Sequence, residues 1–264
     1  MRRETEVAIR AAVGAQKLAD SRAGAEAITS KGGIDLVTAT DFACEDGIRE
    51  DLLGAFPEYP VIGEERGGDP IPGKPFWLVD PICGTRLFAS NVPLYCSNIA
   101  LVEGGEVTVA AIAVGRTGEI LFAEKGAGSW LRITPSGSDR RLAVSGASNA
   151  IWIDGGNRAA EVMRQALLAS RWYVWSYSST VALAHLADGR IAGVPHLGPP
   201  RLPRVGSVHF SAGCLVASEA GAIVIDIDTG HPWDLQTRSY LIAATPGLQG
   251  ELLELLARAE RKQT

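Results

Sequence analysis

Residues 77–85 read Trp-Leu-Val-Asp-Pro-Ile-Cys-Gly-Thr, an apolar run that stops at an acidic side chain and then turns. A short apolar run bounded by turn residues is typical of a buried β-strand. Pro81 and Gly84 favour a tight turn directly after this strand. Such a turn can bring the carboxylate of Asp80 and the main-chain carbonyl of Ile82 to one point, and hard cations prefer oxygen ligands of this kind. The alternative is that Asp80 only caps the turn.

On either side of this strand, the hydrophobic period changes along the chain. Helical spacing predicts helices over residues 4–21 and 41–55, the second with Asp41 as its N-cap. Apolar runs separated by glycine-rich turns predict strands at 61–63, 76–80, 98–103, 107–114 and 120–123. After residue 145, strands at 150–154, 173–177 and 222–227 alternate with helices at 158–170, 179–187, 211–220 and 248–259. This order predicts a layered α/β sandwich.

The change in element order near residue 145 predicts two lobes within one globular unit. We expect an N-terminal α+β lobe over residues 1–145 and a C-terminal α/β lobe over residues 146–264. The segment 194–207 contains four prolines and is expected to be a long irregular loop. His196 and His231 fall in expected loops and are predicted to be solvated, whereas His185 falls within a helix and is predicted to be structural.

The composition limits the class of protein. The 264 residues are 46% hydrophobic and 21% charged, which is ordinary for a soluble globular chain. A net charge of -5 argues against a nucleic-acid-binding domain, which would normally be basic. The four cysteines form no C-x-x-C pair and are expected to be reduced thiols. Without a visible signal peptide or an apolar run of about 20 residues, we expect a cytoplasmic protein that does not enter a membrane.

Two further segments carry candidate site residues. Gly63-Glu64-Glu65 follows a short expected strand, so Glu64 can supply a second carboxylate near Asp80, although a solvated Glu64 is the alternative. Thr85 can orient a water molecule bound to the same cation. The third segment runs from Val208-His209-Phe210 into the expected helix and ends at Glu219-Ala220-Gly221.

These segments, together with one upstream, resemble the motifs of the inositol monophosphatase-like family. Residues 31–41 resemble K-x-x-x-D-L-V-T-x-x-D, residues 63–65 resemble G-E-E, and residues 80–85 resemble D-P-I-D-G-T. The segment from residue 208 onward resembles W-D-x-A-x-G leading into E-A-G-G. The order and spacing hold from about residue 5 to 256, so the chain is identified as a member of the family. The resemblance implies an αβαβα layered sandwich of the inositol monophosphatase/fructose-bisphosphatase type.

The resemblance also implies an activity, that of a Mg²⁺-dependent phosphomonoesterase. Metal ions in such enzymes neutralise the phosphate and activate a water molecule. Transferred position by position, the resemblance assigns the first metal site to Glu64, Asp80 and the carbonyl of Ile82. Thr85 and Asp41 match the pair that holds the attacking water. Lys31 matches a lysine near the phosphate, and Gly84 and Thr85 would present main-chain N–H groups to it.

The sequence departs from the family pattern at the second metal site. Cys83 stands where the motif has its second aspartate, and His209 aligns with the aspartate of W-D, ten residues before Glu219. Trp233-Asp234 is the other W-D in the chain, but it follows the E-A-G segment and is expected in a surface turn. Losing two carboxylates lowers Mg²⁺ affinity. The second site is therefore empty, holds a softer ion such as Zn²⁺, or uses Cys83 as a nucleophile with His209 as its base.

Substrate positions differ from the family as well. Tyr177-Ser178 stands where family members commonly have Gly-Ser, and Arg201 and Arg204 lie where inositol-handling members place a glutamate. These basic residues suggest a substrate with another anionic group, although surface arginines without a partner are the alternative. The resulting hypothesis is a phosphatase for a small phosphorylated sugar, cyclitol, nucleotide or amino alcohol, and a possible homodimer. The alternatives are a repurposed, non-hydrolytic enzyme and a catalytically silent pseudophosphatase.

Overall fold

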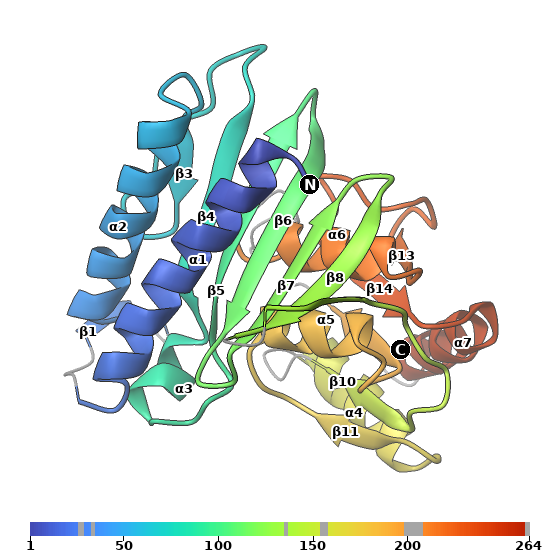
Figure 1. Ribbon diagram of the computed structural model, residues 1–264. Coiled ribbons are helices and arrows are strands. Elements are labelled where there is room, and N and C mark those ends of the chain that lie inside the picture. Colours follow the sequence, from blue (N-terminus) through green and yellow to red (C-terminus); the bar gives the residue numbers. More distant parts are fainter. Residues whose placement is uncertain (26–28, 33–34, 135–136, 154–157, 198–207, 262–264) are drawn as a thin grey trace.

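The computed structural model describes residues 1–25, 29–32, 35–134, 137–153, 158–197 and 208–261 (Figure 1). The helices are α1 Arg3–Arg22, α2 Ala39–Ala55, α3 Thr85–Ala89, α4 Arg158–Leu168, α5 Ser179–Ala187, α6 Ser211–Glu219 and α7 Pro246–Arg261. The first strands are β1 Thr29–Gly32, β2 Asp35–Val37, β3 Val61–Gly63, β4 Phe76–Cys83, β5 Cys96–Glu103, β6 Glu106–Val114, β7 Glu119–Glu124, β8 Gly128–Ile133 and β9 Asp139–Arg141. The remaining strands are β10 Ala150–Trp152, β11 Tyr173–Trp175, β12 Gly193–His196, β13 Ile223–Asp226 and β14 Tyr240–Ala243. Within these residues, no helix combines the length and the apolar character needed to cross a bilayer.

Helices and sheets alternate as layers through the molecule (Figure 1). α1 and α2 cover one face of the large sheet and share a core cluster with Val79, Ile99 and Ala111. α5 and α6 pack between the large and the small sheet. α4 and α7 cover the outer face of the small sheet. The predicted αβαβα sandwich is therefore confirmed, while the division into lobes at residue 145 stays a prediction.

The large sheet has seven strands in the order β3-β4-β5-β6-β7-β8-β9. β3 runs parallel to β4, and each later strand pairs antiparallel with its predecessor. The register of β4 against β5 shifts between Asp80 and Cys83. This irregularity ends the regular strand at the acidic residue, as the turn residues Pro81 and Gly84 predict. The predicted strands of this region are confirmed, whereas β8 and β9 were not predicted.

The small sheet has five strands in the order β11-β10-β12-β14-β13 and corrects one prediction. The expected loop over residues 194–207 is wrong for residues 194–196, which belong to β12 and pair with β14. His196 is 1% exposed, and its ring stacks on Tyr240 with centroids 4.8 Å apart, so its predicted solvation is also wrong. A proline in this strand hid it from the sequence pattern, because proline is unusual inside a sheet.

The start of α2 corrects a second prediction. Thr38, not Asp41, is the N-cap, and Asp41 is the N3 residue of a capping box. Asp41 Oδ2 accepts hydrogen bonds from the main-chain N–H of Thr38 at 2.8 Å and from its hydroxyl at 2.6 Å. One oxygen of this buried carboxylate is thus fixed by the helix terminus, which leaves Oδ1 to face the turn after β4.

The N-terminus is tied to the large sheet by charged side chains. Arg2 Nη1 lies 2.8 Å from Glu103 Oε2, and the hydroxyl of Thr108 also donates to Glu103. The hydrogen bond from Arg2 lowers the pKa of Glu103 below its usual range, against the opposing effect of partial burial. These contacts hold the first turn of α1 against the β5–β6 hairpin.

The Glu103→Gln variant should reduce stability at pH 7 by less than about 1 kcal/mol, because the pair is partly solvated. Since the folded-state pKa of Glu103 is lowered, its contribution is present above the unfolded-state pKa of about 4.3 and is lost as pH falls through the folded value. Urea denaturation at pH 7 and pH 3 should therefore show a difference from wild type that shrinks in acid. Glu106→Gln, at the exposed end of the same hairpin, is the control. An equal difference at both pH values would contradict the assignment.

Candidate metal centre

Three side chains from separate parts of the chain converge at the end of β4. Glu64 directly follows β3, Asp80 lies in β4 and His209 lies just before α6. One donor atom from each lies within 4.8 Å of the others. His209 Nδ1 is 2.9 Å from Asp80 Oδ2 and 3.9 Å from Glu64 Oε2. The parallel pairing of β3 with β4 brings the two carboxylates to the same edge of the sheet.

Asp80 is the buried centre of this group. Its side chain is fully buried, and its Oδ1 has no hydrogen-bond partner among the described residues. Burial raises the pKa of Asp80, the neighbouring Cys83 adds to the rise, and the contact with His209 works against it. Burial opposes a charge on His209, but its hydrogen bond to Asp80 and the nearby Glu64 outweigh burial and raise the pKa of His209. The two neighbouring carboxyl groups therefore favour the protonated form of His209 in this pocket.

This arrangement fits a divalent cation. A buried carboxylate oxygen without a partner is costly unless an ion or a water molecule satisfies it. Asp80 Oδ1 and the carboxylate of Glu64 are hard oxygen donors suited to Mg²⁺, whereas an imidazole nitrogen is suited to Zn²⁺ and related ions. The predicted meeting of Glu64 and Asp80 is therefore found in the structure, together with His209.

Thr85 connects the centre to α2. Its hydroxyl lies 3.3 Å from Asp41 Oδ1 and 3.3 Å from the carbonyl oxygen of Ile82. Thr85 begins the short helix α3, directly after Gly84, whose φ of 100° is one that residues with a Cβ rarely adopt. The turn thus places the Thr85 hydroxyl between the Ile82 carbonyl and Asp41 of α2, and the roles of these groups stay predictions.

Cys83 is not one of the three donors grouped in the described part of the chain. Its thiol lies 3.2 Å from Thr180 Oγ1, and Ser178 Oγ donates to it at 3.3 Å. It also contacts the thiol of Cys96 on the opposite strand, a contact that lowers the pKa of Cys83 despite burial. Thr180 in turn donates to the carbonyl of His209 at 2.6 Å. Cys83 and His209 are therefore joined through Thr180, and their joint binding of one ion stays a prediction.

The remaining predicted substrate residues are placed as follows. Ser178 borders the centre, because its hydroxyl also donates to the carbonyl of Cys83 at 3.1 Å. The hydroxyl of Tyr177 instead bonds His185 Nδ1 at 2.8 Å, within the layer of α5. Lys31 belongs to β1, and Arg201 and Arg204 lie outside the described residues. Their roles at the substrate stay predictions.

Comparison with known proteins shows the family of this chain. The model of the inositol monophosphatase family matches residues 1–263. The chain belongs to the inositol monophosphatase family. An inositol monophosphatase from Dictyostelium discoideum is 30% identical over 92% of this chain and 90% of its own length. The Nus factor SuhB of Vibrio cholerae is 30% identical over 91% and 90%.

Solved structures of this family have the same fold. An inositol monophosphatase from Thermotoga maritima superposes with a TM-score of 0.83 over 97% of this chain and 98% of that one, at 20% identity. Mycobacterium tuberculosis SuhB gives a TM-score of 0.75 over 97% and 96%, at 27% identity. Because most of the sequence differs at such identities, the fold is shared more widely than the side chains.

Glu45 is a positioning residue of this inositol monophosphatase family member that the sequence analysis missed. It lies inside α2, fully buried, and accepts hydrogen bonds from the N–H groups of Glu65 at 2.7 Å and Arg66 at 3.1 Å. Arg49 Nε donates to the same carboxylate at 2.9 Å. A Cβ on Gly63 would lie 1.9 Å from Glu45 Oε1, which explains the glycine before Glu64. Glu45 thus fixes the turn that presents Glu64.

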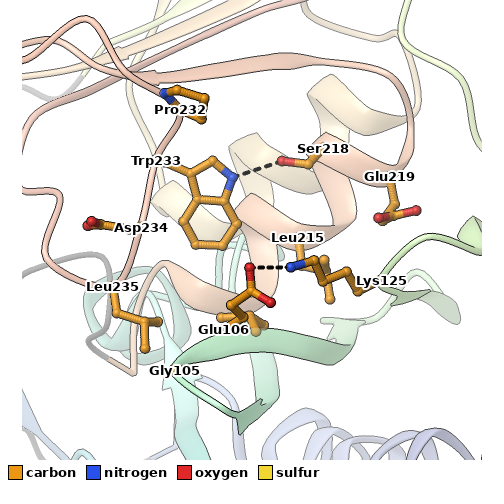
Figure 2. Close-up of a pocket in the computed structure, with 11 residues that line it drawn as sticks. Gly105, Glu106, Lys125, Leu215, Ser218, Glu219, Pro232, Trp233, Asp234 and Leu235 are labelled. Carbon is orange, nitrogen blue, oxygen red and sulfur yellow. Dashed lines mark hydrogen bonds and ion pairs between the residues drawn. The ribbon is translucent and has the colours of Figure 1, made fainter.

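Trp233-Asp234 lies away from the metal centre, as predicted. Figure 2 shows these residues lining a different cavity, of about 290 Å³, beside the C-terminal half of α6. Trp233 Nε1 donates to Ser218 Oγ at 3.0 Å. Asp234 is exposed and accepts hydrogen bonds from the N–H groups of Gln236 and Thr237, so it forms a surface turn.

The Glu45→Gln variant should lose about 1–3 kcal/mol of unfolding free energy, because an amide N–H would face the N–H donors of the turn in a buried place. Guanidinium denaturation measures the loss. Asp46→Asn is the matched control, since Asp46 is the next residue of α2 and pairs with Arg66 in solvent. The control should change stability by less than about 1 kcal/mol. Equal effects of both variants would argue against a role of Glu45 in holding the turn.

Proposed function

We propose that this protein is a Mg²⁺-dependent phosphoric monoester hydrolase for a small phosphorylated sugar, cyclitol, nucleotide or amino alcohol. The observation that carries the proposal is the convergence of Glu64 and the buried Asp80, whose Oδ1 has no hydrogen-bond partner among the described residues, near the Thr85–Asp41 pair. Membership of the inositol monophosphatase family supports the reaction class. The relatives named as inositol monophosphatases support a small phosphorylated substrate for this chain.

Glu64, Asp80 and the carbonyl of Ile82 would hold the ion. When bound, Mg²⁺ neutralises phosphate charge and lowers the pKa of a coordinated water. Asp41 Oδ1 accepts the proton of the Thr85 hydroxyl, so the lone pairs of Thr85 Oγ1 are available to a water molecule. That water can pass its proton through Thr85 to Asp41, which makes the pair the general base. Gly84, Thr85 and Lys31 would bind the phosphate.

The contact between His209 and Asp80 favours a centre that binds one ion, with lower Mg²⁺ affinity than a site made of carboxylates alone. His209 Nδ1 bonds one oxygen of Asp80, and the charge of His209 offsets part of the negative charge that attracts a cation. The second position would then be empty or take a softer ion such as Zn²⁺. A catalytically silent or repurposed member of the family is the alternative that the same contact supports. Ser178, Tyr177, Arg201 and Arg204 would contact the substrate, and a cytoplasmic homodimer completes the proposal.

Purified wild-type protein should release inorganic phosphate from at least one class in a panel of sugar, cyclitol, nucleotide and amino-alcohol phosphates. The release should require Mg²⁺. Asp80→Asn should lower the rate at least 100-fold, because the ion supplies several kcal/mol of transition-state stabilisation. Colorimetric phosphate detection measures both. Release that persists with excess chelator would refute the metal-dependent mechanism.

The double variant Cys83→Asp/His209→Asp should gain Mg²⁺-dependent phosphate release, by roughly tenfold or more, because it adds two hard anionic ligands. Steady-state rates at several Mg²⁺ concentrations measure the gain. Ser178→Ala in the same background tests whether the contact with position 83 matters for folding. A double variant that folds and binds Mg²⁺ but releases no phosphate would favour the silent or repurposed protein instead.

A further inference from the structure

Asn98 lies beside the metal centre in a position that the family motifs do not include. It belongs to β5 and pairs directly with Asp80 of β4. Side chains of directly opposed residues in an antiparallel pair point to the same face of the sheet, with Cβ atoms about 4.5–5.5 Å apart. Asp80 extends from this face to His209, ahead of α6. Asn98 therefore points into the same layer as the Asp80 carboxylate.

The side chain of Asn98 is fully buried and unsatisfied. Its Oδ1 and Nδ2 both lack a hydrogen-bond partner among the described residues, as does Asp80 Oδ1. The residue opposite Asn98 on β6 is the apolar Ile112. Two residues further along β5, on the same face, lies Ala100, which is also apolar. Burying an amide group without hydrogen-bond partners costs free energy. A bound water molecule or ion beside the amide removes this cost.

We propose that Asn98 supplies its amide oxygen to the cation held by Asp80. The inference rests on the proposed function, which assigns a divalent ion to Glu64 and Asp80. An amide oxygen is a hard ligand of the kind that Mg²⁺ and Ca²⁺ accept. The amide oxygen would replace one of the ligands lost at Cys83 and His209. Because it adds no negative charge, the centre would still bind Mg²⁺ more weakly than a site with three carboxylates.

One substitution distinguishes a metal ligand from a residue that only packs, because Mg²⁺ affinity falls only if Asn98 binds the ion. Asn98→Leu has nearly the same size and removes two unsatisfied polar atoms, so the metal-free protein should melt at the same or a higher temperature. If Asn98 is a ligand, the same variant should bind Mg²⁺ at least tenfold more weakly. Isothermal calorimetry with MgCl₂ or MnCl₂ and thermal unfolding in EDTA give the two readouts, and neither requires a substrate.

Ser129→Ala is the matched control. Ser129 lies in β8 of the same sheet, is fully buried, and its hydroxyl also has no partner among the described residues. Its removal should raise or preserve the melting temperature in the same way and leave Mg²⁺ affinity within about twofold of wild type, because the residue is four strands from β4. Asn98→Asp, which adds a carboxylate, should bind Mg²⁺ more tightly and keeps the proposal testable if the leucine variant does not fold.

The outcomes separate this inference from the proposed function. Wild-type binding that is lost in Asp80→Asn but unchanged in Asn98→Leu would overturn the role of Asn98 and leave the metal centre intact. Unchanged Mg²⁺ affinity in Asn98→Asp would overturn it as well. Wild-type protein that binds neither Mg²⁺ nor Mn²⁺ would overturn both proposals. Weakened binding in Asn98→Leu alone, with Ser129→Ala unchanged, is the result that supports it.

Discussion

A fully buried carboxylate at the end of β4 is the constraint on which the rest of the centre depends. Removing a charged Asp80 from water costs several kcal/mol unless other groups compensate. Among the described residues, His209 forms a hydrogen bond with Oδ2 of Asp80, whereas Oδ1 has no hydrogen-bond partner. The shifted register after Asp80, the parallel pairing of β3 and the docking of α6 all bring groups to this carboxylate. In our proposal, a cation bound to Oδ1 offsets the remaining cost of burying the Asp80 charge.

The two departures from the family motif act on this carboxylate in different ways. The imidazole of His209 contacts Oδ2 of Asp80, and in its protonated form it reduces the negative charge that the carboxylate offers to a cation at Oδ1. The thiol of Cys83 instead forms hydrogen bonds with Ser178 and Thr180 at the start of α5. The first substitution therefore changes the charge of the centre, and the second mainly removes a ligand.

Most of the strands and helices were predictable because their apolar periods are strong, although β8, β9 and the proline-containing β12 were missed. Asp80 and Thr85 were identified from the turn after β4, and Glu64 from the segment after β3. Three features of the site were not predictable. Thr38 rather than Asp41 caps α2, because a capping box and an aspartate N-cap share the same residue types. The neighbourhood of Glu45 and Asn98 depends on tertiary contacts and strand register, which a single sequence does not reveal. For Asn98, a polar residue inside an apolar run was the available signal.

The balance of charge in the pocket explains why such a centre can persist with fewer carboxylates. Each carboxylate added to a buried site strengthens cation binding but destabilises the protein before the ion arrives, since like charges repel at short range. In our proposal, the contact of His209 with Asp80 partly neutralises the ion-free pocket, so that the folded state depends less on a bound ion. A neutral oxygen from Asn98 would add to ion binding without increasing that repulsion. In our proposal, weak ion binding and a stable ion-free fold both follow from the arrangement of His209, Glu64 and Asn98 around Asp80.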